Sequence, residues 1–354
     1  MVPLVLVVIA PDSFGGSLSA SQVATALGEG WRRGAPHDTV ELVPLSDGGP
    51  GFVDVLAAAL PSGELLPTTV EDPYGRPVPA AVLLDGTTAY VESAQACGLH
   101  LMAPEERDPE RASTRGVGQL LRVALDAGAG RVVVGLGGSG TNDAGLGALE
   151  TLGDWPPSVE LVAASDVDAP LTGASGATAV FGPQKLAPGA GSAVLDRLER
   201  RMVAAAEVLR ERAGRPVAGL DGAGAAGGLG AALLALGATR VPGIALVMEA
   251  VGLRDRLAGA GVVVTGEGCY DATSLRGKVP NGVARWAQAE GVPCVVVAGV
   301  SAVGVREARA HAVDEVHTTS EAAGGEAGSL AEPARWLAVV AERLARQWSP
   351  ARSV

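Results

Sequence analysis

Runs of apolar residues alternate with amphipathic stretches along the whole chain. The run at 4–10 is continuous, as in a strand buried on both faces, whereas 19–32 repeats apolar residues at helical spacing behind Ser19, a suitable N-cap. Further strands are expected at 40–45, 131–134, 160–168, 262–268, 293–299 and 314–319, and further helices at 51–59, 114–127, 195–212, 281–289, 305–312 and 331–347. This alternation predicts an α/β architecture with parallel sheets.

Residues 66–93 have a different pattern. They contain two strand-like runs joined by an Asp-Gly turn, which is typical of antiparallel pairing, so a second domain is expected to begin here. The predicted layout is a doubly wound, Rossmann-like parallel-sheet domain made of residues 1–65 and 258–354. A second α/β domain, residues 66–257, is inserted in it.

Composition narrows the classes of function. With 47% hydrophobic and 19% charged residues, the 354-residue chain can bury large cores and is not of the disordered class. A net charge of −12 without a basic run argues against nucleic acid and anionic membranes as partners. The stretch 222–239 has a near-membrane length, but its six glycines favour a loop leading into a helix over a membrane span.

The cysteines and the first residues of the chain indicate the cellular compartment in which the protein is expected. Cys97, Cys269 and Cys294 are few, odd in number and unpatterned, which favours a reducing compartment without disulfides or a structural zinc site. The apolar start lacks a positively charged flank, so it is interpreted as a strand and not as a signal peptide. A cytoplasmic protein is expected, and a homodimer is left open.

Lysine and asparagine are so rare in this chain that the positions at which they occur are candidates for a functional site. All but two of the 27 basic residues are arginine, the exceptions being Lys185 and Lys278, and the chain has only two asparagines, Asn142 and Asn281. A GC-rich genome would produce this bias, and chance survival of these four is an alternative. Three of them nevertheless lie in glycine-bearing motifs, where an ammonium and a guanidinium are not interchangeable.

Glycine-rich loops follow five of the expected strands. They read APDSFGGSLSA, SDGGPG, GLGGSGTNDAG, SDVDAPLTG and TGEGCYD. Loops at the carboxyl ends of strands line the ligand crevice of open α/β sheets. These loops carry seven carboxylates, which need cations such as Mg²⁺ or lysine if they converge: Asp12, Asp47, Asp143, Asp166, Asp168, Glu267 and Asp271. Carboxylates, a divalent ion and exposed backbone N–H groups together suit a polyphosphate ligand.

Individual loops are less specific than the set. GLGGSGTNDAG matches neither the P-loop nor the dinucleotide-binding pattern, so a tight turn is an alternative. Close helix packing is the alternative for 221–236, and a solvated loop is the alternative for FGPQK at 181–185. The four histidines stand in no metal or triad spacing and are interpreted as structural.

Taken together, six ordered motifs resemble the bacterial type 1 glycerate kinases, which phosphorylate glycerate with ATP to 2-phosphoglycerate. The motifs span residue 4 to about residue 300 and are APDSF-x-x-SLSA, DGG-x-G, GGS-x-TND-x-G, DVD-x-PLTG-x-x-GA-x-x-FGPQK, GAGAAGGLGAALLALGA and TGEG-x-x-D-x-x-S-x-x-GK-x-P-x-GVA. The resemblance implies a kinase of the same two-domain α/β fold, with ATP and Mg²⁺ as cofactors.

The resemblance and the chemistry of phosphoryl transfer suggest a role for each motif. Asp47 or Asp143 would act as base toward the acceptor hydroxyl, Lys278 would neutralise the transferred group, and Asp166 with Asp168 would hold Mg²⁺. Backbone N–H groups of the TND loop, with Ser139 and Thr141, would cradle phosphate oxygens. The full set expected to bind substrate or nucleotide is Asp12, Ser13, Ser17, Gly48, Gly49, Gly137, Gly138, Ser139, Thr141, Asn142, Lys185, Gly266, Glu267 and Asp271.

Five motif positions depart from the family pattern. Gly15, Pro50, Phe52, Cys269 and Thr273 stand where the family usually has lysine, glutamate, threonine, arginine and glutamine. Loss of cationic partners predicts weak binding of the glycerate carboxylate. The alternatives are a kinase for another small hydroxylated metabolite and a protein that binds a phosphorylated metabolite without turnover. A dinucleotide-dependent oxidoreductase would fit the sheet, but the sequence lacks its fingerprint.

Overall fold

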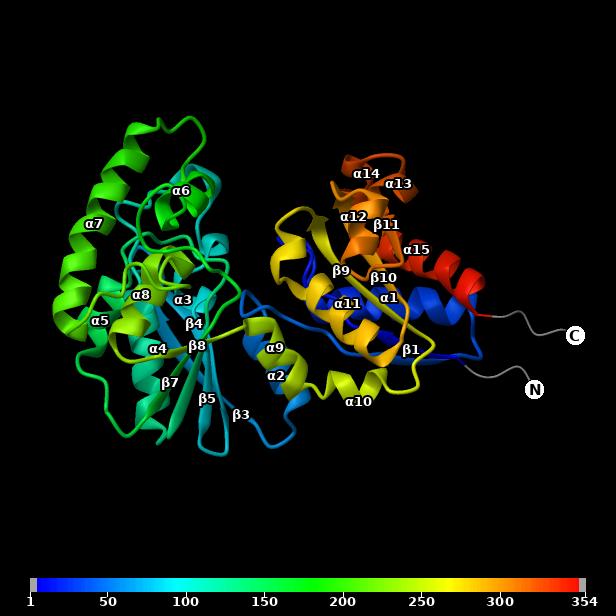
Figure 1. Cartoon of the computed structure of the whole chain (residues 1–354), viewed down its shortest axis with the longest axis horizontal. Coiled ribbons are helices and arrows are strands. Elements are labelled where there is room, and N and C mark those ends of the chain that lie inside the picture. Colours follow the sequence, from blue (N-terminus) through cyan, green and yellow to red (C-terminus); the bar gives the residue numbers. More distant parts are fainter. Residues whose placement is uncertain (1–4, 350–354) are drawn as a thin grey trace, which may run out of the picture. The chain divides into compact units, whose positions relative to one another are not determined.

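The computed structural model describes residues 5–349. The chain divides into two compact units. Unit 1 consists of the chain up to Ser46 and from Ile244 onward, and unit 2 is Asp47–Gly243 (Figure 1). The α/β class with parallel strands is confirmed in both units.

Unit 1 is built on a five-stranded parallel sheet in the order β11-β10-β9-β1-β2. Its elements are β1 (Leu6–Ile9), α1 (Ala20–Gly34), β2 (Thr39–Leu42), α9 (Gly243–Ala250), α10 (Leu253–Leu257), β9 (Val262–Tyr270), the 3₁₀ helix η5 (Ser274–Arg276), α11 (Val279–Glu290), β10 (Cys294–Ser301), α12 (Val305–Ala310), β11 (Glu315–Thr318), α13 (Thr319–Ala323), α14 (Glu326–Ala331) and α15 (Pro333–Trp348). In order of appearance this is a 2-1-3-4-5 arrangement, the doubly wound type whose ligands bind where the order reverses, here between β1 and β9.

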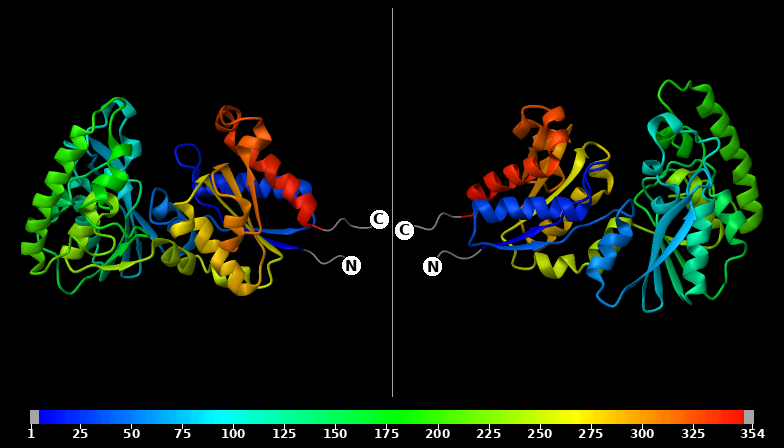
Figure 2. Two further views of the ribbon diagram at one scale, coloured as in Figure 1. Left: turned by 45° about the horizontal axis from the view of Figure 1, so that its top comes forward. Right: turned by 180° about the vertical axis from the view of Figure 1, so that it is seen from behind.

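Alternating side chains bury both faces of this sheet. Val7 and Ile9 face the core formed with α1 and α15, which lie along each other in both views of Figure 2. Val8 is also fully buried, on the face where α11 packs against β9 and β10. Helix α1 begins at the predicted N-cap: Ser19 Oγ accepts from Gln22 N, and Gln22 Oε1 accepts from Ser19 N.

Unit 2 contains a six-stranded mixed sheet in the order β3-β4-β5-β6-β7-β8. Its elements are α2 (Phe52–Ala59), β3 (Glu64–Glu71), β4 (Pro77–Asp85), β5 (Thr88–Glu92), α3 (Ala94–Cys97), η1 (Leu99–Leu101), η2 (Pro104–Glu106), α4 (Arg115–Asp126), β6 (Arg131–Gly135), α5 (Leu146–Leu152), β7 (Glu160–Ala164), α6 (Ala177–Phe181), η3 (Pro183–Lys185), α7 (Ala193–Ala213), η4 (Ala225–Gly228), α8 (Leu229–Ala235) and β8 (Thr239–Val241). Strands β5 to β8 are parallel, and α4, α5 and α8 share one hydrophobic core with them.

The prediction of two strands within 66–93 was incomplete, because β3, β4 and β5 form three antiparallel-paired strands. The predicted Asp-Gly turn joins β4 to β5. The missed turn between β3 and β4 is closed by Asp72, whose Oδ1 accepts the N–H groups of Tyr74 at 2.8 Å and Arg76 at 2.9 Å.

The expected domain boundaries also differ from the limits of the two units. A break at 65/66 would cut β3, whereas unit 2 begins at Asp47 and therefore includes α2. Glu92 Oε2 accepts the N–H groups of Gly51 at 3.1 Å and Val53 at 3.2 Å, which ties the start of α2 to β5. A break at 257/258 falls at the end of α10, whereas unit 1 resumes at Ile244.

No helix within residues 5–349 combines the length and the apolar character that a bilayer crossing requires. The glycine-rich stretch that begins at 222 instead forms η4 and the seven-residue helix α8.

Candidate active-site loops at the carboxyl ends of the two sheets

Two predicted loops of unit 2 touch above the ends of β6 and β7. A Cβ atom added to Gly48 would lie 3.0 Å from Ala164 O, and one added to Gly137 would lie 2.6 Å from Gly49 Cα. The SDGGPG loop therefore crosses the sheet edge in backbone contact with the GLGGSG loop, and glycine is needed where the two main chains meet.

Asp47 lies at the start of this crossing. Its side chain is half-buried, and Oδ1 accepts the N–H of Gly49 at 3.1 Å. A Cβ atom added to Gly243 would lie 2.1 Å from Asp47 O and 3.3 Å from Asp166 Oδ2. The loops that carry these two aspartates therefore meet at Gly243, and the structure brings both residues to the same corner of unit 2.

The segment 137–139 presents backbone donors. No acceptor within the described residues takes the N–H groups of Gly137, Gly138 or Ser139. Gly138 is exposed and left-handed, with φ +64°, while the flanking loop is fixed by Leu99 N donating to Gly138 O at 2.8 Å and by Gly140 N donating to Cys97 O at 2.8 Å. Successive N–H groups around a left-handed residue form an anion-binding concavity.

Beneath this segment lies Lys185, which is only 1% exposed, so a solvated loop is wrong for it. Its Nζ donates to Thr141 O at 2.6 Å and to Ser139 Oγ at 3.3 Å. Burial lowers the pKa of Lys185 to about 8.

Thr141 and Asn142 were expected to contact substrate or nucleotide, but their side chains do not reach the surface of the loop. Both are fully buried, and Asn142 Nδ2 donates to Thr178 Oγ1 at 3.1 Å. Their side chains therefore support the loop from inside, and ligand contacts at its surface would fall to Ser139 and the glycines.

Asp143 was expected to be catalytic, but its surroundings are those of a structural cap. It is 1% exposed. Its Oδ2 accepts Thr114 N and Oγ1, both at 2.9 Å, and also Ser113 Oγ and Gly147 N, while Oδ1 accepts Gly145 N at 3.0 Å. A carboxylate that is buried and already accepts five hydrogen bonds within its own unit is poorly placed to act as a base, so these contacts favour a structural role for Asp143 over the catalytic one.

One member of the predicted metal pair, Asp168, is engaged by another side chain. Asp168 is exposed and pairs with Arg240 at 2.5 Å, so its charge is already neutralised by a side chain of the same unit. Over residues 5–349 no group of three or more histidine, cysteine, aspartate and glutamate side chains is arranged to hold a metal ion. Asp168 is therefore engaged in a surface ion pair, Asp166 lies near Asp47, and a role of either residue in holding Mg²⁺ stays a prediction.

In unit 1, the loop after β1 meets the carboxyl-terminal half of β9 where the strand order reverses; the TGEG residues expected in a loop belong to this strand. Asp12 N donates to Gly266 O at 2.9 Å, and Lys278, the residue before α11, places Nζ 3.3 Å from Glu267 Oε2. Glu267 is 5% exposed; burial raises the pKa of its carboxyl, and Lys278 opposes that shift. These residues form a partly buried charged group beside the N-terminus of a twelve-residue helix.

The remaining predicted residues of unit 1 make local contacts. Asp12 Oδ1 accepts Ser13 N at 2.6 Å, and Ser17 Oγ donates to Phe14 O at 2.9 Å within its own turn. Asp271 accepts Thr273 N and Oγ1, and these hydrogen bonds lower the pKa of Asp271. Thr273 thus has a local role in holding the loop after β9.

The other departures from the family pattern have distinct environments. Phe52 is fully buried, with its ring edge-on to that of Tyr90, so it is a core residue. Pro50 packs on Gly138, and Gly15 has open space around its Cβ position and no left-handed φ. Cys269 is exposed, with Sγ 3.9 Å from Asp271 Oδ2. Neither Gly15 nor Cys269 supplies a positive charge to these loops.

Sequence reasoning missed Glu92, the last residue of β5. It is 5% exposed and caps the start of α2 through the two N–H groups described above. Burial raises the pKa of Glu92 to about 7, although these hydrogen bonds oppose the shift. No local pattern could have revealed it, because its partners lie about forty residues away in sequence.

Glu92 should make the stability of unit 2 depend on pH. The folded state binds the Glu92 proton more tightly than the unfolded chain, whose carboxyl has the usual pKa of 4.5, so stability falls as pH rises from about 4.5 to 7. Glu92→Gln keeps an acceptor for α2 without the buried charge. It should exceed wild type in unfolding free energy by about 1–3 kcal/mol at pH 8, and the gain should shrink at pH 5. Urea unfolding at both pH values measures this, and an equal difference at both would contradict it.

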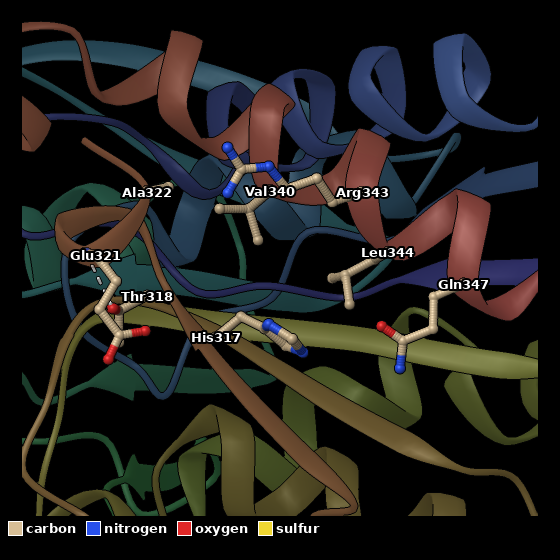
Figure 3. A pocket seen from close by; sticks show the side chains of 8 residues that line it. All are labelled: His317, Thr318, Glu321, Ala322, Val340, Arg343, Leu344 and Gln347. Carbon is tan, nitrogen blue, oxygen red and sulfur yellow. Dashed lines mark hydrogen bonds between the residues drawn. The ribbon is translucent and has the colours of Figure 1, made fainter. Parts of the chain in front are cut away.

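Unit 1 also contains a cavity of about 310 Å³ between β11, α13 and α15 (Figure 3). Its lining residues are His317, Thr318, Glu321, Ala322, Val340, Arg343, Leu344 and Gln347. None of the predicted site residues lines this cavity, so it does not belong to the loops described above.

Comparison with known proteins gives a consistent result. The model of the glycerate kinase family matches residues 7–156 and 154–349. The chain is 40% identical over 341 residues to a glycerate kinase of Halalkalibacterium halodurans, covering 87% of this chain and 89% of the relative. It is 37% identical over 351 residues to glycerate 2-kinase of Escherichia coli K12, covering 90% and 91%. A crystal structure described as glycerate kinase 2 from Salmonella typhimurium LT2 superposes with a TM-score of 0.75 at 35% identity, covering 98% of each chain.

Proposed function

The chain belongs to the glycerate kinase family, and from this premise we propose that it transfers the γ-phosphoryl group of ATP to a hydroxyl of glycerate. The observation that carries the proposal is the 137–139 segment, whose unpaired N–H groups lie over a buried lysine and contact the loop of a half-buried aspartate. Phosphoryl transfer depends mainly on positioning and on neutralising charge, and this arrangement supplies both.

We assign the base to Asp47. Of the two carboxylates proposed for this role, Asp143 is occupied by five donors, whereas Asp47 Oδ1 accepts only Gly49 N within the described chain. Asp47 would accept the proton of the acceptor hydroxyl as that oxygen attacks the γ-phosphorus and the bond to the β-phosphate oxygen breaks. ADP and the phosphorylated acceptor are the products.

In unit 1, Lys278 and the start of α11 would neutralise phosphate charge. Helix N-termini attract anions through unsatisfied N–H groups, and the ammonium of Lys278 adds a full charge there. We propose that Mg²⁺ enters with ATP, because Mg²⁺ is usually held by substrate phosphates plus one or two carboxylates. Asp166 is the remaining candidate carboxylate, since Asp168 is paired with Arg240.

A second acceptor class is favoured by one observation. Gly15 and Cys269 leave the loop after β1 and the end of β9 without the lysine and arginine that the family usually carries there. A less anionic hydroxylated metabolite would not need these charges. Turnover of such an acceptor with none on glycerate would favour this second function.

Asp47→Asn should lower kcat on glycerate by about 10²-fold or more, the usual contribution of a general base. Unfolding free energy should hardly change, because the asparagine Oδ1 can still accept Gly49 N. ADP release in a coupled assay measures the rate. Asp168→Asn is the matched control, with the same loss of charge at an exposed ion pair, and it should retain activity near wild type. Wild-type turnover in Asp47→Asn would remove Asp47 from the reaction.

A further inference from the structure

Lys185 is a buried cation that makes no direct ion pair within the described residues. It is 1% exposed, and among residues 5–349 no carboxylate lies within ion-pair distance of Nζ. Removing an ammonium from water without pairing it with an anion is costly. Its hydrogen bonds go only to neutral oxygens, Thr141 O at 2.6 Å and Ser139 Oγ at 3.3 Å. A buried cation without an ion-pair partner is suited to a ligand that brings a negative charge.

The contact with Ser139 fixes the direction of a hydrogen bond. An ammonium has donors and no acceptor, so Ser139 Oγ must accept from Lys185 and its own proton is left to donate. In the described chain that proton has one partner, Thr141 O at 3.4 Å, which is long for an O–H···O bond. An anionic oxygen above the loop would be a better acceptor.

Strained backbone holds this geometry in place. A Cβ atom added to Gly227 would meet Thr141 O at 1.9 Å and Lys185 Nζ at 2.9 Å. Gly227 follows Ala226, which has φ +50°, and Gly227 O accepts the N–H of Ala144, which has φ +57°. Two non-glycine residues in the left-handed region mark backbone that the surrounding packing must hold in place, as is frequent near functional sites.

We propose that Lys185 is a positioning residue that makes segment 137–139 an anion-binding loop: it fixes Ser139 as a donor and adds positive charge beneath the backbone N–H groups of Gly137, Gly138 and Ser139. The inference rests on the proposed function only in taking the loop to meet an anionic group of a substrate. That group is either a phosphate of the nucleotide or the carboxylate of the acceptor.

Proton loss from Lys185 would weaken the loop at high pH. The other ionisable groups near it are Cys97 of α3, Asp143 and Arg107, whose Nη1 donates to Gln184 O. Burial raises the pKa of Cys97 to about 12, so its thiol stays neutral, whereas the Asp143 carboxylate opposes deprotonation of Lys185. Of these groups, Lys185, with its pKa lowered to about 8, is the one that changes charge between about pH 7 and 9. Glu92, with a pKa of about 7, also titrates in unit 2, so the part of the pH dependence that belongs to Lys185 is the part that Lys185→Met removes.

The test is calorimetric binding of sulfate and of D-glycerate, measured separately at about pH 6.5 and 9 on the full chain. Neither anion titrates in this range, so a change in affinity belongs to the protein. For one of the two anions, wild type should lose up to about 10-fold in affinity at the higher pH, the loss expected when a group of pKa about 8 gives up its proton and with it one charge-assisted hydrogen bond. If the affinity for sulfate falls at the higher pH, the loop is assigned to a phosphate group. If the affinity for D-glycerate falls, the loop is assigned to the carboxylate of the acceptor.

Three variants separate this role from a structural one. Lys185→Met should fold, bind that anion weakly and show no dependence on pH, whereas Ser139→Ala should bind it more weakly than wild type but keep the dependence. Gln184→Met, an exposed neighbour on the same 3₁₀ helix, is the matched control and should behave as wild type. Binding and pH dependence of the wild-type kind in Lys185→Met would overturn the inference, as would no binding of either anion to wild type at pH 6.5. Absence of kinase turnover alongside the predicted binding would instead count against the proposed function.

Discussion

Asp143→Asn should lower the unfolding free energy of unit 2 by about 3–5 kcal/mol, because it disrupts a buried carboxylate that five donors share. An asparagine has one oxygen. Its amide nitrogen must face either Gly145 N on one side or the N–H and hydroxyl of Thr114 on the other, so donor meets donor in either orientation.

Denaturant unfolding, with activity expressed per folded molecule, measures the effect of Asp143→Asn. Asp126→Asn makes the same chemical change at an exposed position of α4 and should leave stability near wild type. The surviving folded fraction of Asp143→Asn should retain turnover. A variant as stable as wild type and without activity would restore Asp143 to the catalytic group.

Lys278→Ala should lower kcat by about 10²-fold or more, and Lys278→Arg by about 10-fold, as expected for a cation that stabilises charge in the transition state. The arginine variant keeps the charge but replaces a compact ammonium with a planar fork. Loss of Lys278 also leaves Glu267 without its ion pair, so the pKa of that buried carboxyl should rise further and the group should take up a proton.

A paired substitution distinguishes loss of charge at the phosphate from loss of the ion pair. Lys278→Met combined with Glu267→Gln removes both charges and should recover any stability lost in the single lysine variant, but not the rate. ADP release and urea unfolding are measured on the same preparations. Recovery of turnover in the double variant would show that Lys278 serves Glu267 and not the substrate.

The strand pattern was enough to predict which loops come together, because the carboxyl ends of parallel strands share one edge of a sheet. It placed the Asp12 loop beside the end of β9 that carries Glu267, and it likewise placed the loops of Asp47 and Gly137 together. It could not separate Asp47 from Asp143, since each follows a strand and precedes glycines. The difference arises from Thr114, the residue before α4 and twenty-nine residues earlier in the sequence, which only the fold brings to Asp143.

The burial of single side chains and their long-range partners could not be predicted from the sequence either, because the fold brings together residues that are far apart in the chain. The sequence of the Asp168 loop suggests a metal ligand, but it does not reveal that Arg240, seventy-two residues away, forms an ion pair with Asp168. Lys185 lies in a short polar motif that would suit a surface loop, yet η3 packs it beneath the 137–139 segment. Glu92 ends an ordinary strand, and its partners begin a helix that precedes the hairpin.

The most direct test of this account is ADP release by the wild-type protein with D-glycerate as the sole acceptor, with the product identified by ³¹P NMR. We expect Mg²⁺-dependent turnover that yields 2-phosphoglycerate, with activity lost in Asp47→Asn and kept in Asp168→Asn. Saturation should require a high glycerate concentration, since neither Gly15 nor Cys269 supplies a positive charge. No phosphorylated glycerate at any concentration, from a protein that binds ATP and is fully folded, would contradict the assignment of glycerate as its acceptor.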